Sequence, residues 1–321
     1  MSDYFLGVDG GQSSTVAVIS DETGKVIGWA TAGPCNHVSA AESRAKFLRV
    51  MGECVLQAAS RAGMPTGKPR FRGACLGMSG GPEDKAGLLH EVFDAGHLLV
   101  THDGRIALAG ATMGEPGIIV VAGTGSIAFG ENGKSESARA GGWGHIFGDE
   151  GGGFDVVRQA LRAALAEHEG WGPVTALTPA LLEATGTANA NQTLHLFYTP
   201  EWPRSRVAGL ARLVDQIAQE GDPVAGDILQ RAAMQLAMLA GTVRRQLWNT
   251  RDLPEKPLRV AWIGGVFNST TVLERFRMLI ELEGHAVSAP PAHSPAVGAL
   301  LIALKLAGVI VLPYQVPVIK S

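Results

Sequence analysis

Near the N-terminus, two short apolar runs are separated by a glycine-rich turn. The runs cover residues 5–8 and 16–19, and Asp9, Gly10 and Gly11 begin the turn. Two β-prone runs at this spacing predict a β-hairpin. A Rossmann fingerprint would require a helix after the turn, and a Walker A loop would require Gly-Lys-Ser/Thr, so neither motif is present. The chain is therefore expected to begin with antiparallel pairing around a turn of small polar residues.

This turn has a composition that suits phosphate binding. Backbone N–H groups of a glycine turn and neighbouring hydroxyls can face a phosphate. The candidate phosphate ligands are the glycines and hydroxyl residues Gly10, Gly11, Ser13, Ser14 and Thr15. Asp9 ends the first strand and is the candidate carboxylate for Mg²⁺, through water, because Mg²⁺ retains part of its hydration shell. The alternative is a tight turn solvated by its serines, and the hairpin alone does not decide between the two.

Composition places the chain among ordinary globular enzymes. Its 321 residues are enough for two lobes, 46% are hydrophobic, 18% are charged, and the net charge is −3. Nucleic-acid-binding domains are typically basic, so we expect no nucleic-acid partner. The cysteines Cys35, Cys54 and Cys75 have no C-x-x-C spacing. We expect core residues in a reducing compartment, and no zinc or iron–sulfur ligands.

One apolar segment needs comparison with a membrane span. Residues 296–312 are apolar apart from Lys305. The segment is slightly short for a span and contains Gly298 and Gly308. We predict instead a buried helix that leads into a short strand at 309–311. With no signal-peptide pattern at the N-terminus, we expect no membrane partner and a cytoplasmic location.

The remaining pattern alternates strands and helices, which predicts an α/β fold. Expected strands after the hairpin are 25–30, 71–78, 98–101, 117–122, 127–129, 258–263 and one near residue 287. Expected helices are 40–62, 82–95, a short one ending near residue 111, 154–168, most of 175–248, 272–283 and one from residue 294.

The opening pattern returns in the middle of the chain. A buried strand at 117–122 is followed by Gly123, Thr124, Gly125 and Ser126, and then by a return strand. The sequence therefore predicts two related halves, each opening with a hairpin. We place the lobes at 1–116 and 117–321, with packing of the last helix on the N-terminal lobe left open.

Six motifs occur together in an order that is specific to one family. They are Asp9-Gly10-Gly11 with Ser13 and Thr15, Thr101-x-Asp103, Gly123-Thr124-Gly125-Ser126, Gly141-Gly142-Trp143-Gly144-His145, Gly148-Asp149-Glu150-Gly151, and Gly264-Gly265-Val266-x-x-Ser269. From residue 5 to about 300 the chain resembles the N-acetylglucosamine kinases of the BadF/BadG/BcrA/BcrD-type ATPase family. The resemblance implies a two-lobed, actin/hexokinase-like (ribonuclease H-like) α/β fold with the active site in the interlobe cleft.

The resemblance implies phosphoryl transfer from ATP, with Mg²⁺, to the 6-hydroxyl of an amino sugar, N-acetylglucosamine or glucosamine. Asp103 is the implied general base, at the end of a strand beside Gly104. Its alternative role is the N-cap of the short helix that follows. Asp149 is implied to bind sugar hydroxyls, whereas Glu150 could favour the start of the next helix through its dipole.

The resemblance also assigns the remaining ligands. The two hairpins would hold the phosphates from opposite sides, and a segment without side chains would let adenine approach closely. The implied nucleotide-binding residues are Asp9, Gly10, Gly11, Ser13, Ser14, Thr15, Gly123, Thr124, Gly125, Gly264, Gly265 and Ser269. The implied sugar-binding residues are Asn36, Asp103, Ser126, Gly142, Trp143, Gly144 and Asp149. For Trp143 the alternative is a core tryptophan, and for His145 we expect a structural hydrogen bond.

The sequence departs from the family pattern at Ile127. The resembling kinases have an asparagine here that contacts the sugar, and isoleucine has no polar group to donate. The sugar is therefore open between N-acetylglucosamine, glucosamine, an N-acetylmuramic-type sugar and another hexose. A homodimer is implied by analogy.

Three other functions remain open from the sequence. The same family contains ATPases that activate 2-hydroxyacyl-CoA dehydratases and hold an iron–sulfur cluster through cysteines. A second group of bacterial sugar kinases includes repressors, but these carry a cysteine-rich zinc motif. A non-catalytic nucleotide-binding switch would bind ATP without sugar-stimulated turnover.

Overall fold

The computed structural model describes residues 3–11, 13–35, 40–78, 86–134, 136–248 and 254–316, with the side chains of 40–43 left aside. The chain divides into two compact units. Unit 1 comprises Met1–Glu115 with Pro291–Ser321, and unit 2 comprises Pro116–Pro290. Each unit contains one five-stranded mixed sheet.

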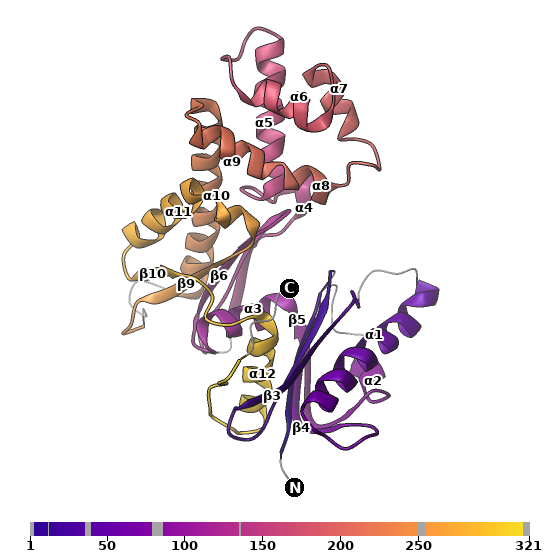
Figure 1. The fold of residues 1–321 in the computed structure, drawn as a ribbon. Helices are drawn as coiled ribbons and strands as arrows, with labels where there is room; N and C mark the ends of the chain where they lie inside the picture. The colour runs from indigo at the N-terminus through magenta and orange to yellow at the C-terminus, as the bar shows by residue number, and fades with distance from the viewer. Residues whose placement is uncertain are drawn as a thin grey trace. The chain divides into compact units, whose positions relative to one another are not determined.

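The sheet of unit 1 has the strand order β3-β2-β1-β4-β5 (Figure 1). The first three strands form an antiparallel meander, and β4 and β5 continue the sheet in parallel with β1. The bounds are β1 Phe5–Gly10, β2 Thr15–Ser20, β3 Val26–Ala32, β4 Arg70–Met78 and β5 Asp94–His102.

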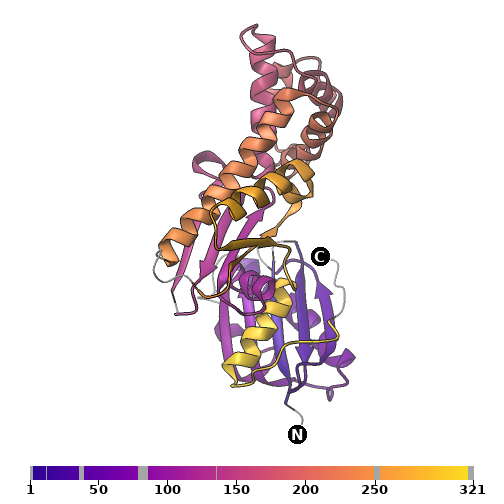
Figure 2. The ribbon, with the colours of Figure 1, turned by 90° about the vertical axis from the view of Figure 1, so that its left-hand side faces the viewer.

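Helices cover both faces of this sheet. On one face, α1 (Ala40–Arg61) packs against Leu6 and Val8, which alternate with the residues of the other face. On the other face, Phe5 joins a core with Leu300 of α12 (Pro295–Leu306). Figure 2 shows α12, in yellow, in front of these strands, and α3 (Asp103–Thr112) packs beside it.

Unit 2 repeats this topology. Its sheet has the order β10-β9-β6-β7-β8, in which β6, β7 and β8 form the meander and β9 and β10 continue in parallel. The bounds are β6 Gly117–Ala122, β7 Ser126–Glu131, β8 Ser137–Gly141, β9 Leu258–Ile263 and β10 Ala286–Ala289. The expectation of two related α/β halves that each open with a hairpin is therefore confirmed.

Most helices of unit 2 pack against one core, centred on β6 and α10, while α8 packs against α5 in a smaller cluster. Figure 1 shows α6 and α7 grouped beside α5. The bounds are α4 Gly144–Phe147, α5 Gly153–His168, α6 Leu177–Thr185, α7 Ala190–Leu196, α8 Arg204–Gly209, α9 Ala211–Gln219, α10 Pro223–Leu247, the 3₁₀ helix η1 Gly265–Asn268 and α11 Thr270–Leu282.

Three expected elements differ in the structure. The helix expected at 82–95 is reduced, within the described residues, to α2 (Ala86–Leu89), because β5 begins at Asp94, whose N–H donates to the Pro69 carbonyl. β8 was not expected, because its residues are only partly buried and lack β-branched side chains. Residues 309–311 form no strand, and only Tyr314 pairs with Lys25 nearby.

The expected second lobe, 117–321, differs from unit 2 at its C-terminal end. Residues after Pro290 belong to unit 1. The physical reason is the close contact of α12 with β1, where a Cβ on Gly7 would lie 2.3 Å from the Leu300 nitrogen. A backbone approach this close is open only to glycine.

The apolar C-terminal segment and the three cysteines both contribute to the packed interior of unit 1. Within the described ranges, no helix is both long and apolar enough to cross a membrane. Cys35, Cys54 and Cys75 are buried thiols in unit 1. Burial raises the pKa of the Cys54 and Cys75 thiols to about 12.

Candidate active site

Asp9 and Asp103 come together at one edge of the sheet in unit 1. Because β1, β4 and β5 run parallel, their carboxyl ends meet, with Gly10 opposite Met78 and Met78 opposite His102. Desolvation, followed by the negative charge of Asp103, raises the pKa of Asp9 to about 6. Two sequence-predicted carboxylates therefore interact electrostatically at this edge.

Asp103 is exposed in the first turn of α3, but it is not the N-cap of that helix. The cap is His102, whose Nδ1 accepts a hydrogen bond from the Arg105 N–H at 3.2 Å. Asp103 Oδ1 accepts from the Gly104 N–H at 2.8 Å. The N-cap alternative is therefore wrong, and Asp103 is in the first turn, where the helix dipole favours a carboxylate.

In the turn after β1, some of the polar groups expected to bind phosphate already form hydrogen bonds within the protein. The Gly11 N–H donates to the Ser14 carbonyl at 3.0 Å, which closes the turn. Thr15 is fully buried, and its hydroxyl donates to the Gly33 carbonyl at 2.9 Å. The expectation that this hydroxyl faces a phosphate is wrong, because it links β2 to the end of β3. Ser13 is exposed and Ser14 is half-buried.

Gly10 lies in close contact with two neighbouring side chains. A Cβ at this position would lie 2.4 Å from Met78 Sδ and 2.9 Å from Cys35 Sγ. The strand end therefore keeps its backbone close to β4, which holds Asp9 beside the α3 terminus.

The second hairpin is docked on the N-terminus of α5. The Gly123 carbonyl accepts from the Gly153 N–H at 2.8 Å, and the Thr124 carbonyl accepts from the Phe154 N–H at 3.0 Å. Within the part of the chain that the structure describes, the N–H groups of Thr124 and Gly125 donate to no acceptor. These two amides can bind a phosphate oxygen.

Asp149 lies buried under this hairpin in a strained backbone conformation. Its φ is +64°, which is uncommon for a residue other than glycine. Its Oδ2 lies 3.0 Å from Arg204 Nη2, and its Oδ1 accepts from the Ser126 N–H at 3.4 Å. A Cβ on Gly125 would lie 2.4 Å from Asp149 Oδ2, so only glycine fits over the carboxylate.

Sequence reasoning missed Arg204, the ionic partner of Asp149. This arginine begins α8 and also lies 3.3 Å, through Nη1, from the Nδ1 atom of His145. No motif in the sequence links it to Asp149, which is 55 residues away.

Glu150 and the start of α5 also differ from the expectation. The Glu150 carbonyl accepts from the Ser126 hydroxyl at 2.6 Å. The acidic residue in the first turn of α5 is Asp155, which accepts from the Gly151 N–H at 3.0 Å. The dipole role expected of Glu150 therefore belongs to Asp155.

The loop that holds Trp143 exposes the indole. Trp143 is 66% exposed, which excludes the core alternative. Its neighbours Gly142 and Gly144 have φ values of +71° and +79°, a region that favours glycine. The Gly142 N–H donates to the Ser126 carbonyl at 3.0 Å, so this loop is tied to the second hairpin. Asn36 lies outside the described residues.

The expected adenosine segment forms a pocket together with the second hairpin. Gly264 ends β9 with a φ of +112°, and a Cβ there would lie 2.3 Å from the Ala122 carbonyl oxygen. Ser269 caps α11 by accepting from the Val272 N–H at 3.3 Å. The pocket is lined by Gly123, Thr124, Gly153, Val156, Ser205, Ala208, Gly209, Ala211, Arg212, Asp215, Leu229, Gly265, Val266, Asn268 and Ser269.

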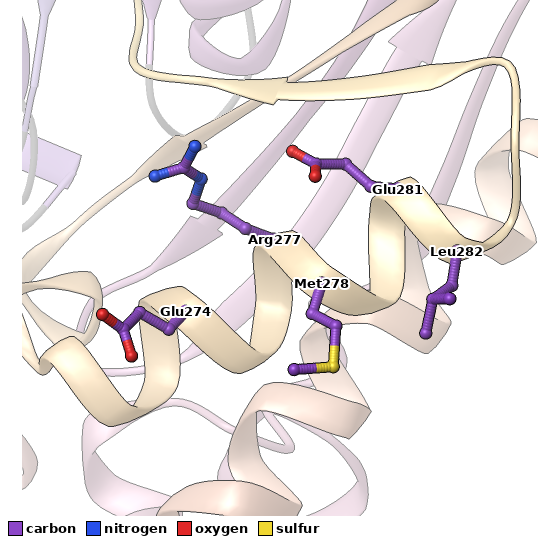
Figure 3. Close-up of a pocket in the computed structure, with 5 residues that line it drawn as sticks. All are labelled: Glu274, Arg277, Met278, Glu281 and Leu282. Atoms are coloured by element: carbon purple, nitrogen blue, oxygen red, sulfur yellow. The ribbon is translucent and has the colours of Figure 1, made fainter.

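Another hollow lies on the surface of α11 and contains none of the predicted site residues. Figure 3 shows its side chains, which all come from this one helix. They are Glu274, Arg277, Met278, Glu281 and Leu282. The described residues contain no group of three or more histidine, cysteine or acidic residues that could hold a metal ion by itself.

Two α/β units with the same strand order, each opening on a glycine hairpin, define a duplicated fold of the actin/hexokinase type. A ROK family glucokinase from Streptomyces griseus, solved with glucose and AMPPNP, shares this fold with a TM-score of 0.53, 17% identity, and coverage of 94% of this chain and 99% of that chain. The chain belongs to the BadF/BadG/BcrA/BcrD ATPase family, whose sequence model matches residues 6–303.

Several proteins that are similar to this chain along most of its length are named as amino-sugar kinases. The chain is 32% identical to an N-acetylmuramic acid/N-acetylglucosamine kinase from Clostridium acetobutylicum, over 94% of this chain and 98% of the relative. It is 28% identical to an N-acetyl-D-glucosamine kinase from Dictyostelium discoideum, with the same coverage of both chains. A candidate N-acetylglucosamine kinase from Chromobacterium violaceum has a TM-score of 0.68 and 27% identity, over 94% of this chain and 99% of that chain.

Proposed function

We propose that this protein is an ATP-dependent kinase that phosphorylates the 6-hydroxyl of an amino sugar, with N-acetylglucosamine and glucosamine as the leading substrates. The observation that carries the proposal is the placement of half-buried Asp9 and exposed Asp103 at the same sheet edge, where their charges influence each other. The named functions of the relatives support the same chemistry. A glucosamine kinase from Vibrio cholerae is also similar, at 28% identity over 54% of this chain and 59% of its own.

In this proposal ATP binds in the pocket of unit 2. The adenosine lies between the second hairpin and the start of α11, near Gly265 and Ser269. The N–H groups of Thr124 and Gly125 bind phosphate oxygens, and the turn after Asp9 contributes further phosphate ligands, Ser13 and Ser14 among them. Phosphoryl transfer depends mainly on such positioning and charge stabilisation.

Asp103 takes the proton from the attacking 6-hydroxyl in the proposed reaction. Its position in the first turn of α3, where the helix dipole favours negative charge, suits a carboxylate that acts as a general base. Asp149, held by Arg204, orients other sugar hydroxyls, and the exposed face of Trp143 packs against the sugar ring. Asn36 remains a proposed sugar ligand from the resemblance.

Asp9 is the proposed residue for Mg²⁺, which when bound would neutralise charge on the transferring phosphate. The donor chemistry fits a hard cation, because two carboxylates repel each other at this edge and a divalent cation relieves the repulsion. With so few protein donors, waters and phosphate oxygens supply most of the coordination shell.

An ADP-release screen with purified protein tests the proposed function. The sugars are glucosamine, N-acetylglucosamine, N-acetylmannosamine, N-acetylmuramic acid and glucose, each with ATP and Mg²⁺. We expect sugar-stimulated ADP release with at least one amino sugar, and a 6-phosphorylated product by mass spectrometry and NMR. ATP binding without stimulation by any sugar would contradict the proposal and favour a nucleotide switch.

The dehydratase-activator alternative receives no support from the cysteines. A cluster ligand must be a thiolate, whereas burial raises the pKa of Cys54 and Cys75 to about 12. Iron–sulfur clusters absorb visible light at about 350 to 450 nm, so an absorbance spectrum of the purified protein tests this point independently. A homodimer and a cytoplasmic location remain part of the proposal, and light scattering would measure the first.

A further inference from the structure

Near the proposed sugar site, Arg139 has no ionic partner among the residues that the structure describes. The Arg139 guanidinium lies over the indole ring of Trp143, with its carbon 4.6 Å from the ring centroid. Arg139 is exposed, and among the described residues no carboxylate pairs with it. Neighbouring arginines differ, because Arg204 pairs with Asp149 and Arg158 pairs with Asp155 at 2.6 Å.

The strand register places Arg139 on the same sheet face as Ile127. In the antiparallel pair of β7 and β8, Phe129 is opposite Arg139 and Ile127 is opposite Gly141. Opposed residues share a face, and residues two apart along a strand also share a face. Ala128 and Ala140 point the other way, into the core of unit 2. Arg139 is thus a diagonal neighbour of the position where the resemblance expects a sugar contact.

Trp143 lies close to both Arg139 and the loop that carries Asp149. A Cβ on Gly148 would lie 3.0 Å from the Trp143 Cβ, so the tryptophan packs on the residue just before Asp149. The indole ring of the same residue stacks with the Arg139 guanidinium. A ligand held by Asp149 and in contact with Trp143 can therefore extend toward Arg139.

Stacking leaves the donors of Arg139 available. A guanidinium stacks through its flat face, while its five N–H groups point outward in the plane. These donors match the two oxygens of a carboxylate. Ile127 offers no polar group to an acetamido substituent, so this face of the site combines an apolar side chain with one unpaired cation.

Building on the proposed function, we infer that Arg139 binds the carboxylate of an acidic amino sugar. N-acetylmuramic acid, which carries a carboxylate on an ether substituent of the sugar ring, is an amino sugar of this class and is in the name of one relative. Arg139 is then a specificity-determining residue: it distinguishes sugars by charge and takes no part in phosphoryl transfer.

The test compares the phosphorylation of two sugars by the parent protein and by variants of Arg139. We expect Arg139→Gln to lower the ratio of kcat/KM for N-acetylmuramic acid to kcat/KM for N-acetylglucosamine by about 10- to 100-fold, because a hydrogen-bonded charge pair is lost. The loss should be mainly in KM, since the ground state and the transition state share this contact. Arg139→Lys should give an intermediate ratio, because lysine keeps the charge but not the fork of donors.

Arg206→Gln is the matched control. Arg206 also lies over a tryptophan, 4.0 Å from the centroid of Trp202, but it is in α8 and outside the proposed sugar site. We expect this variant to leave the ratio of the two sugars unchanged.

The outcomes separate this inference from the proposed function. If N-acetylglucosamine is phosphorylated and N-acetylmuramic acid is not, the inference is wrong and the kinase proposal stands. An equal loss for both sugars in Arg139→Gln would also overturn the inference, because it indicates a structural role. If no amino sugar is phosphorylated, the proposed function itself fails.

Discussion

Asp9 and Asp103 show how one sheet edge can give two carboxylates different properties. Asp9 is half-buried, and its loss of solvation together with the nearby charge of Asp103 raises its pKa to about 6, while Asp103 is exposed at a helix start. A buried carboxylate beside another negative charge costs stability when it is ionised. The site thus keeps an unfavourable charge at neutral pH that a bound cation would compensate.

The first prediction concerns Asp9 and pH. The pKa of Asp9 is about 6 in the folded protein, against an ordinary value of 3.8 in the unfolded chain. Between these pH values the folded state therefore binds more protons than the unfolded state. The free energy of unfolding contributed by this group therefore decreases as pH rises from about 4 to about 6, and stays lower above that. The total effect is about 3 kcal/mol at 1.36 kcal/mol per pKa unit.

We expect Asp9→Asn to unfold at a higher temperature than the parent protein at pH 8 without metal, and to lose that advantage near pH 4. Thermal unfolding followed by circular dichroism at both pH values provides the measurement. A variant less stable than the parent at pH 8 would show that Asp9 does not carry an unfavourable charge there. Adding Mg²⁺ to the ATP complex should raise the unfolding temperature more in the parent protein than in Asp9→Asn.

At the level of single residues, the sequence identified acids and glycines better than their partners. Asp149 follows from its motif, but Arg204 does not, because an ion pair across 55 residues depends on the fold. Thr15 was misassigned since its hydroxyl bonds Gly33, a contact that exists only after β2 and β3 pair. Asp103 was the alternative candidate for the cap of α3 because aspartate is a more usual cap than histidine, but the cap is His102.

At the level of elements, glycines decide how closely α12 can approach its neighbours. A Cβ on Gly298 would lie 2.0 Å from the Ile106 carbonyl and 2.3 Å from the Gly110 nitrogen, both in α3. α3 begins at Asp103, so the packing of α12 supports the helix that holds the proposed base. By contrast, a Cβ on Gly226 in α10 would lie in open space.

Gly298→Ala should destabilise the protein by about 3 kcal/mol or more, because backbone atoms of α3 cannot move aside as flexible side chains can. Gly226→Ala, the control, should be neutral or stabilise by up to about 1 kcal/mol, since alanine is the better helix former. Urea denaturation of both variants measures the difference. Equal stability of the two variants would contradict the close packing of α12 on α3.

The elements themselves were largely predictable, because alternation and helical periodicity are local signals. Both hairpins, β4, β9 and α5 lie within a few residues of their expected positions. The helix expected at 82–95 failed because pairing of β5 with β4 overrides local propensity from Asp94 on. The sequence of β8 has no strand-like pattern, because this strand forms through its pairing with β7 and not through its own β-propensity.

At the level of the whole molecule, the chain comprises two units of the same topology that contribute different chemistry. Unit 1 holds the two carboxylates, and unit 2 holds the pocket between the second hairpin and α11. The repeat was visible in the sequence because both halves open on the same strand, turn and strand pattern. The return of α12 to unit 1 was left open, because contact between residues as distant as Gly7 and Leu300 has no local signal.

Nucleotide binding should depend on the pocket of unit 2. A side chain at Gly265 would extend into open space there, so Gly265→Leu should fill the pocket without disturbing the core. For the parent protein, ATP at 100 times its Kd should stabilise by about 2.7 kcal/mol, seen as a rise in Tm. We expect the variant to keep its ligand-free Tm and to lose this rise. An unchanged ATP response would place the nucleotide elsewhere.

The central claim is that Asp103 acts as the base of a sugar kinase, and Asp103→Asn tests it most directly. Sugar-dependent ADP release and ATP binding by calorimetry are measured on the same preparations of parent protein and variant. The account predicts a turnover about 10² to 10⁴ times lower with ATP affinity within about threefold of the parent value. Near-normal turnover in Asp103→Asn would contradict it.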